Sequence, residues 1–402
     1  HVMNYTDVDD KIIQRANAMQ VDPFQLSQKY IDEFNQHLQE LNIKPATFNP
    51  RASAEMPKII HLVQVLIEKG FAYPKDGDVY FRVRKFKDYG KLSGRKLEEM
   101  QAGARVEVDE RKEDPLDFAL WKAAKPGEPS WESPWGRGRP GWHIECSVMC
   151  MEHLGEQIDI HGGGNDLIFP HHENEIAQSE AATGKPFVRY WIHNGMLQLS
   201  GEKMSKSSGN LVTIEDFLSK HPADALRMMV LNGGYRNPLA FNDEVIGQTE
   251  NALERLRLAL KPAQPDATGI DPESQSQFES EIEKDRNDFE SFMQDDFNTS
   301  GALSTMFNLV RLINQKRAEG ATDAQLQVGQ STLQELAQIL GLRLDMPKKE
   351  NAADEFINLL LEVRQEARAQ KLWSLADMIR DRLTALGVII EDSKAGSTWR
   401  WK

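Results

Sequence analysis

The chain has 402 residues, of which 40% are hydrophobic, so it is long enough to form about two to four domains with cores of their own. No apolar run in the sequence approaches the roughly 20 residues of a membrane-spanning helix, and the N-terminus lacks the basic-then-apolar pattern of a signal peptide, so a cytoplasmic protein without a membrane partner is expected. The net charge of -14 argues against loose binding of nucleic acid, and any such partner must be met by local basic patches.

The first part of the chain is predicted to mix helices with short strands. Residues 1–10 have the pattern of a short strand that runs into an acidic loop. Asp22 is followed by a proline, which is typical of a helix start, and the apolar residues after it have helical spacing. A second helix is predicted to end at Gly70, and the turn residues at the start of DGDVYFRV, 76–83, lead into a strand.

The segment 121–142 is rich in tryptophan and proline, which excludes a helix and predicts an ordered loop held by aromatic packing. Strands and helices then alternate. HIEC is predicted as a strand leading into a helix, QIDI as a strand with HGGG as its tight turn, and a helix is predicted to begin near Pro170. VRYWIHNGML, 188–197, is predicted as a further strand. This alternation indicates an α/β fold with a parallel sheet.

The second half of the chain is predicted to be almost entirely helical. From about residue 215 the apolar residues recur at helical spacing, which favours a helical bundle interrupted by a polar linker at 262–275. The tail, 354–390, is predicted to add two helices before the sequence VIIEDSKAGSTWRWK.

The stretch HGGGNDLIFPHHENE, 161–175, concentrates residues that bind metals. His171 and Glu175 are four apart on the predicted helix and share a face. Cys146, at the end of the preceding predicted strand, would complete a sulfur, nitrogen and oxygen set for zinc, one ligand short of a closed structural site. A capped helix start with solvated side chains explains the spacing equally well, and His172 is an alternative to His171.

A second stretch, SGEKMSKSSGN at 200–210, holds Lys203 and Lys206 in a polar loop suited to neutralising a polyphosphate. Solvated lysines would give the same composition. The ordered string KMSKS, however, resembles the signature of class I aminoacyl-tRNA synthetases and stands where that class carries it, after the last strand of its Rossmann-type core. DALR at 224–227 and DDFNT at 295–299 resemble the helical domain of one subset of the class.

The stretch 161–175, with GWHIECS before it, closely resembles the cysteinyl-tRNA synthetase family, and the similarity runs from NYTDVDDK to GSTWR. The resemblance implies a Rossmann-type α/β catalytic core with a parallel sheet, followed by an all-α helical bundle and a small C-terminal anticodon-reading domain. The expected bounds are 1–210 for the catalytic domain with a connective insertion at about 75–140, 211–250 for a linking helical region, 251–350 for the bundle and 351–402 for the anticodon-binding domain.

The resemblance also implies roles for individual residues. The zinc ligands would be Cys146, His171 and Glu175, and the cysteine pocket would be lined by Thr6, Trp142, His161 and Asp166, with Asp166 near the substrate ammonium. Lys203 and Lys206 match the catalytic signature lysines, with Lys206 at the ATP pyrophosphate. Arg368, Trp373, Asp377 and Asp392 match positions that read the anticodon. From the residues alone, packing explains Trp142 better than a role in the pocket, and an Asx turn explains Asp166 equally well.

The activity that the resemblance implies has two steps. L-cysteine is activated by ATP with Mg²⁺ to the adenylate, and the acyl group then passes to cysteine tRNA. One zinc per chain would select the substrate thiolate, because shape alone separates such similar substrates by only about 1–3 kcal/mol. The expected partners are cysteine tRNA, L-cysteine and ATP, and a monomer is expected.

The chain departs from the family pattern in one respect. The family carries a HIGH motif and a fourth zinc ligand, a cysteine, upstream of the position of His1, and neither is in this sequence, so the chain as given is expected to be inactive. Cys150 lies one helical turn beyond Cys146 and resembles no family ligand. Two alternatives stay open, namely a related ligase that joins cysteine to an amino sugar and a non-catalytic remnant that binds zinc or tRNA.

Two further regions are candidates for contact with tRNA. The run FRVRKFKDYGKLSGRK, 81–96, has seven Lys or Arg against one Asp, although a solvated surface would look the same. Trp373, Trp399 and Trp401 lie in the tail with neighbouring cations, as in proteins that stack on unpaired bases, and packing within the tail is the alternative for Trp373.

Overall fold

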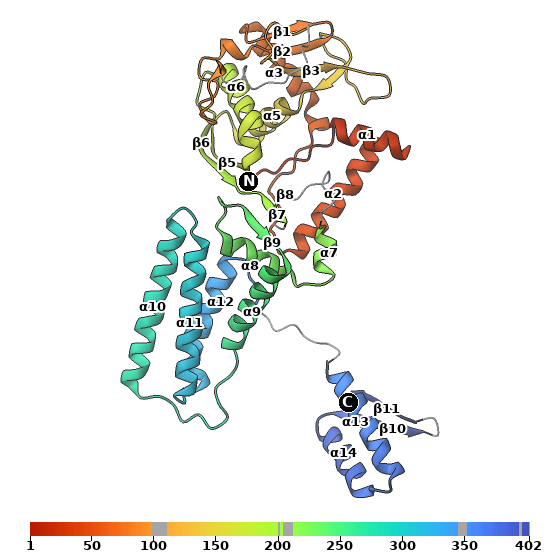
Figure 1. Ribbon diagram of the computed structural model, residues 1–402, viewed down its shortest axis with the longest axis vertical. Coiled ribbons are helices and arrows are strands. Elements are labelled where there is room, and N and C mark those ends of the chain that lie inside the picture. The colour runs from red at the N-terminus through yellow and green to blue at the C-terminus, as the bar shows by residue number, and fades with distance from the viewer. Residues whose placement is uncertain (99–110, 200–201, 204–211, 345–351, 394–395, 402) are drawn as a thin grey trace. The chain divides into compact units, whose positions relative to one another are not determined.

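The computed structural model describes the chain except for residues 99–110, 200–201, 204–211, 345–351, 394–395 and 402. The chain divides into two compact units, His1–Leu344 and Asp345–Lys402 (Figure 1). None of the helices in the described residues is long and apolar enough to cross a membrane.

The N-terminal segment leads into two helices, α1 (Asp10–Met19) and α2 (Pro23–Glu40). The Asp22 side chain accepts hydrogen bonds from the backbone N–H groups of Phe24 and Gln25, which confirms the predicted helix start. The prediction of a strand over residues 1–10 is wrong. This segment makes only isolated parallel bridges, Val2 with Phe48 and Tyr5 with Arg51, and Asp10 already belongs to α1.

The first half of the chain contains a 4-stranded antiparallel sheet. Its order is β1 (Ala72–Lys75), β2 (Asp78–Phe81), β3 (Phe118–Ala123) and β4 (Gly138–Pro140), and α3 (Met56–Glu68) packs in the same core. The predicted strand after residue 76 and the helix that ends before Gly70 are confirmed. Segment 121–142 is a loop only in its middle, because its ends pair as β3 and β4 and Trp142 begins a helix. Short 3₁₀ turns lie at Ala52–Glu55, Val83–Lys85 and Asn165–Leu167.

The parallel part of the fold follows. Its elements are α5 (Trp142–Leu154), β5 (Ile158–Gly164), α6 (Glu173–Thr183), β6 (Val188–Asn194), β7 (Leu197–Leu199), β8 (Glu202–Lys203) and β9 (Leu239–Phe241). β5 pairs with β6 in parallel, and β7 pairs with β9 in parallel and with β8 antiparallel. The parallel α/β fold predicted from the sequence is confirmed.

Two local predictions in this part are wrong. HIEC lies in the first turns of α5, where Ile144 and Val148, one helical turn apart, both enter the core. HGGG continues β5, paired with β6 as far as Gly164, and is not a turn. The helix predicted to begin near Pro170 is confirmed, because the turn Ile168–His172, in which only Phe169 is extended, runs directly into α6 at Glu173.

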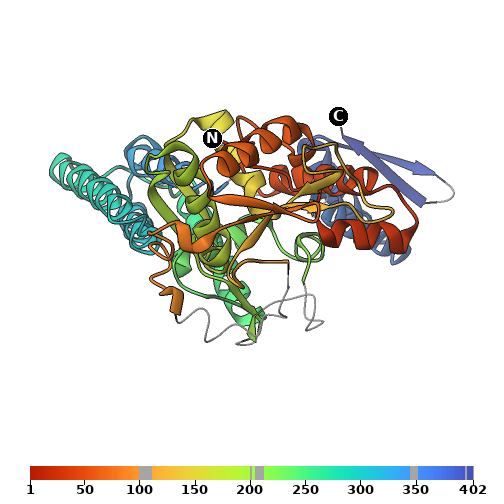
Figure 2. The same cartoon turned by 90° about the horizontal axis from the view of Figure 1, so that it is seen from above.

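The helical half of the first unit contains α7 (Ile214–Leu218), α8 (Ala223–Gly233), α9 (Asp243–Ala259), α10 (Pro272–Gln294), α11 (Thr299–Ala318) and α12 (Asp323–Ile339). α10 and α11 pack side by side along their length (Figures 1 and 2). The buried Arg317 of α11 donates hydrogen bonds to the carbonyls of Ala259, Lys261 and Pro262, which ties the end of α9 to the bundle. The predicted bundle is confirmed.

The second unit holds α13 (Ala352–Ala369), α14 (Trp373–Ala385) and an antiparallel hairpin, β10 (Val388–Ser393) and β11 (Gly396–Trp401). The two tail helices are confirmed, and the hairpin is the form taken by the last residues of the chain. A small core of Ile357, Leu361, Leu383 and Val388 joins the helices to the hairpin.

Candidate metal centre

A cavity of about 230 Å³ lies where α5, β5 and the start of α6 meet the N-terminal segment. α5 contributes Cys146 and Cys150, β5 contributes His161, and the turn and first residues of α6 contribute His171 and Glu175. The side chains that bear metal-binding atoms therefore come from three successive elements of the α/β part. The C-terminal end of a parallel strand is the usual position of a ligand site in such folds.

Glu175 is the centre of this cluster and has 0% of its side chain exposed. Its Oε2 lies 2.8 Å from His161 Nε2, and its Oε1 lies 2.9 Å from His171 Nε2. Oε1 nevertheless has no hydrogen-bond partner among the described residues. A buried carboxylate oxygen without a hydrogen bond lowers the stability of the folded protein. A cation between this oxygen and the imidazole nitrogen would interact favourably with both atoms.

The ring of His171 is held on two sides. Its Nδ1 lies 2.9 Å from Nδ1 of His143, and the Trp142 ring packs against it at 4.1 Å between centroids. Burial and the neighbouring His171 lower the pKa of His143 to about 3, so His143 is neutral and can accept the Nδ1 proton of His171. With its proton on Nδ1, His171 would present an unprotonated Nε2 at 2.9 Å from Glu175 Oε1, as a metal ligand requires.

The structure brings together the three predicted zinc ligands. Donor atoms of Cys146, His171 and Glu175 all lie within 4.8 Å of one another. Sulfur, nitrogen and oxygen ligands arranged as a tetrahedron around zinc are about 3.3–3.6 Å apart. A small inward movement of the three side chains would therefore bring their donor atoms to these separations. Burial and the charge of Glu175 raise the pKa of Cys146 well above its usual value, and a bound cation would reverse this by stabilising the thiolate. These residues fit a zinc ion.

The four predicted cysteine-pocket residues divide into two pairs. His161 lines the cavity, and Trp142 stacks on His171 with 44% of its surface exposed. Thr6 is half-buried in the N-terminal segment, and Asp166 is exposed in the 3₁₀ turn after β5; neither lines the cavity.

The remaining predicted site residues are spread over the molecule. Lys203 ends β8, where its backbone pairs with that of Gln198, and Lys206 lies outside the described residues. In the second unit, Trp373 begins α14 with 57% of its surface exposed. Arg368 is exposed in α13, and Asp377 pairs with Arg380 at 3.5 Å. Asp392 lies opposite Ser397 in the hairpin.

The basic run 81–96 is less of a free cationic surface than its composition indicates. Arg82 is paired with Glu113 at 2.8 Å, Arg84 with Asp114 at 2.5 Å, and Lys91 with Glu180 at 2.5 Å. These partners lie outside the run, in a loop and in α6, so the sequence of the run alone does not show them.

Several residues around the centre are missed by sequence reasoning. His172 Nδ1 lies 2.8 Å from His193 Nε2, and Trp191 stacks on His161 at 4.8 Å between centroids. Trp191 and His193 are two apart on β6 and therefore share a face, a spacing that could have identified them. His143 is three residues before Cys146, a helical spacing that the strand interpretation of HIEC concealed.

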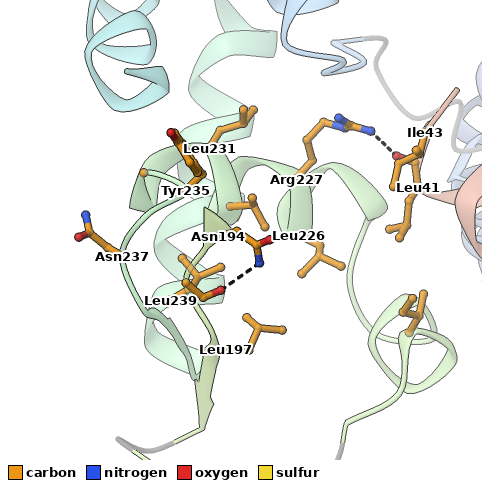
Figure 3. Close-up of a pocket in the computed structure, with 14 residues that line it drawn as sticks. Leu41, Ile43, Asn194, Leu197, Leu226, Arg227, Leu231, Tyr235, Asn237 and Leu239 are labelled. Carbon is orange, nitrogen blue, oxygen red and sulfur yellow. Dashed lines mark hydrogen bonds between the residues drawn. The ribbon is translucent and has the colours of Figure 1, made fainter. Parts of the chain in front are cut away.

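A second cavity, of about 510 Å³, lies between the end of α2, β6, β7 and α8 (Figure 3). Its walls are mainly aliphatic, including Leu41, Leu197 and Leu226. Arg227 donates to the carbonyl of Leu41 at 2.7 Å, so its guanidinium closes one side (Figure 3). This cavity contains none of the metal-binding side chains.

Comparison with known proteins places the fold. The structure resembles the Mycobacterium tuberculosis methionyl-tRNA synthetase solved in complex with methionyl-adenylate, with a TM-score of 0.60 and 16% identity over 90% of this chain and 86% of that one. The likeness at this identity is one of fold. Residues 1–251 match the family described as "tRNA synthetases class I (C) catalytic domain", and residues 288–345 match the DALR domain. The fold and site thus define a class I aminoacyl-tRNA synthetase.

The particular family follows from the whole-chain relatives. Residues 351–400 match the "Cysteinyl-tRNA ligase anticodon binding domain". The chain is 53% identical to a cysteine–tRNA ligase of Dehalococcoides mccartyi and 48% identical to one of Carboxydothermus hydrogenoformans, in each case over 100% of this chain and 86% of the relative. The chain therefore belongs to the cysteine–tRNA ligase family, and it is an enzyme of the ligase class.

Proposed function

We propose that the protein activates L-cysteine with ATP and Mg²⁺ and transfers it to cysteine tRNA, with one zinc ion at Cys146, His171 and Glu175 selecting the substrate by its thiol. The observation that carries this proposal is the buried Glu175 Oε1, which lies 2.9 Å from His171 Nε2 beside Cys146 and has no hydrogen-bond partner among the described residues. When bound, zinc supplies an open position that prefers a soft thiolate to a hydroxyl.

The chain's own residues prepare this position. His143 fixes the tautomer of His171, and the Asn4 amide lies 3.7 Å from the Cys146 sulfur, where it donates a weak hydrogen bond. His161, which contacts Glu175, and Trp142, which packs against the ring of His171, are proposed to enclose the cysteine side chain. Asp166 is proposed to approach the substrate ammonium, and Thr6 to complete the pocket from the N-terminal segment.

The activation step transfers the cysteine carboxylate to the α-phosphate and releases pyrophosphate. Lys203 and Lys206 are proposed to neutralise the charge on the departing phosphates, with Lys206 closest to them. The terminal ribose hydroxyl of tRNA then attacks the acyl carbon and adenosine monophosphate leaves. Positioning of substrates and charge stabilisation account for most of the rate in such reactions.

The second unit is proposed to recognise tRNA. Trp373 is exposed and can stack on an unpaired base, while Arg368, Asp377 and Asp392 are proposed to contact the anticodon edges. The domain assignment proposed is catalytic for 1–210 with its insertion at about 75–140, linking for 211–250, bundle for 251–350 and anticodon-binding for 351–402.

The test measures binding of cysteine against serine to the zinc-loaded and the zinc-free protein by calorimetry. Zinc-loaded protein is expected to prefer cysteine by more than about 200-fold, the most that shape alone provides for one small group. Zinc removal should abolish that preference while leaving ATP affinity nearly unchanged. Equal binding of serine and cysteine to the zinc-loaded protein would disprove the proposed selection by zinc.

A further inference from the structure

Cys150 has no part in the proposed function, yet it lies in the same cavity as the metal centre. It is one helical turn beyond Cys146 on α5, and donor atoms of Cys150, His161 and Glu175 all lie within 4.8 Å of one another. We propose that these three residues form a second site for a thiophilic divalent cation, bridged through the Glu175 carboxylate to the site of Cys146 and His171.

The geometry of Glu175 supports a shared carboxylate. Its two oxygens face different imidazoles, since Oε1 lies 2.9 Å from His171 Nε2 and Oε2 lies 2.8 Å from His161 Nε2. The two ligand sets have only Glu175 in common, so a cation in one set leaves a sulfur and a ring nitrogen of the other set available. Carboxylates bridge the cations of many two-metal sites.

The second set is also accessible and held in place. Cys150 and His161 are half-buried and line the cavity of about 230 Å³, so a hydrated cation can reach them. The ring of His161 is stacked on Trp191 at 4.8 Å with an angle of 19° between the planes. Binding would displace the thiol proton of Cys150 and the proton between His161 and Glu175, and both would pass to solvent.

Occupation of the second site would have a functional consequence, which rests on the proposed function. His161 is proposed to line the cysteine pocket, and a cation bound to its ring would fix that ring away from the substrate. Excess zinc would then compete with cysteine. The existence of the site does not depend on this consequence, because it can be measured by metal binding alone.

The experiment titrates zinc into the metal-free full chain and measures two quantities, the zinc retained per chain and the alkylation of each cysteine by iodoacetamide. The chain has 2 cysteines, so mass spectrometry can score each separately. The wild type is expected to retain two zinc ions and to protect both thiols. Cys150→Ala should retain one zinc, and Cys146→Ala should retain one zinc with Cys150 still protected, because each loses a ligand from only one set.

A matched control and a rescue separate ligation from folding. His193→Gln removes an imidazole beside the cluster that belongs to neither set, so it should leave two zinc ions bound. Cys150→His exchanges one ligand type for another and should restore the second zinc. The proposal is overturned if Cys150→Ala binds zinc with the stoichiometry and affinity of the wild type. It is also overturned if the zinc-saturated wild type leaves Cys150 fully reactive, a result that needs no variant to fold.

Discussion

His143 orients the imidazole of His171 without belonging to the predicted ligand set. His143→Phe keeps an aromatic ring of similar size and removes the nitrogen 2.9 Å from His171 Nδ1. Zinc affinity is expected to fall by about 10- to 100-fold, because the tautomer of His171 is no longer fixed. Competition with a chelator measures the change. His153→Phe removes another imidazole of α5, which contacts Glu55 and not the cluster, and should have no effect. Equal affinities in the two variants would contradict the role of His143.

The lowered pKa of Asp10 predicts that the free energy of unfolding depends on pH. Burial alone would raise its pKa, but Lys122 and Arg139 outweigh burial and hold the pKa below the usual 3.8. A carboxyl with a lowered folded-state pKa stabilises the protein above its unfolded pKa, and this contribution is lost as pH falls through the folded-state value. Asp10→Asn should therefore lower the free energy of unfolding at pH 7 by about 1 kcal/mol or less, because Asp10 is half exposed. Thermal unfolding at a series of pH values measures this, and the difference from wild type should disappear once the pH falls below the folded-state pKa of Asp10.

The control for this measurement is an exposed pair. Asp159→Asn removes the partner of Arg189, and the two side chains are 81% and 68% exposed, so little change is expected at any pH. A difference between wild type and Asp10→Asn that persisted at low pH would show that the effect of Asp10 is not electrostatic.

At the scale of elements, the glycines of β5 allow other residues to approach the strand closely. A Cβ on Gly163 would lie 2.8 Å from Cε1 of His172 and 2.9 Å from Cδ1 of Leu167, whereas one on Gly162 would meet only the Ile192 carbonyl oxygen at 3.5 Å. Gly163→Ala is expected to destabilise the protein by about 1–3 kcal/mol, because buried neighbours must shift. Gly162→Ala is the matched control. Denaturant unfolding measures both, and equal effects would contradict the packing argument.

The elements also show what the sequence can predict about the site. His171 and Glu175 are close because residues four apart in a helical segment share a face, a local property that the sequence carries. A string as short as HIEC has too few residues to distinguish a strand from a helix, and its alternation predicts a strand although it is helical. The position of α5 over β5 depends on long-range packing. The contacts of Trp191 and His193 depend on the pairing of β5 with β6, which no local pattern specifies.

For the whole molecule, the sequence predicts that an α/β part precedes a helical bundle. This prediction is possible because the change from alternating strands and helices to long helical repeats extends over many residues. The partners of the basic run 81–96 could not be predicted, since Glu113 lies in a loop and Glu180 in α6, both outside the run. The proposed tRNA contact of the second unit can be tested through its exposed tryptophan.

Trp373→Ala is expected to weaken binding of cysteine tRNA by about 1–3 kcal/mol, the contribution of one base stacked on an aromatic ring. Zinc content and cysteine binding should be unchanged, because Trp373 belongs to the second unit. Leu386→Ala is the control, since Leu386 is an exposed apolar residue of the same unit, 74% exposed, with no ring to stack. A filter-binding titration measures both. Equal losses in the two variants would point to an apolar surface and not to stacking.

α5 carries Trp142, His143, Cys146 and Cys150 toward the metal centre from a single helix. Each residue of a helix adds about 100° of rotation, so inserting or deleting one residue between His143 and Cys150 would turn the later side chains away from Glu175. Variation among natural or engineered versions of this chain is therefore expected to change α5 by substitution alone and to leave its length between His143 and Cys150 unchanged.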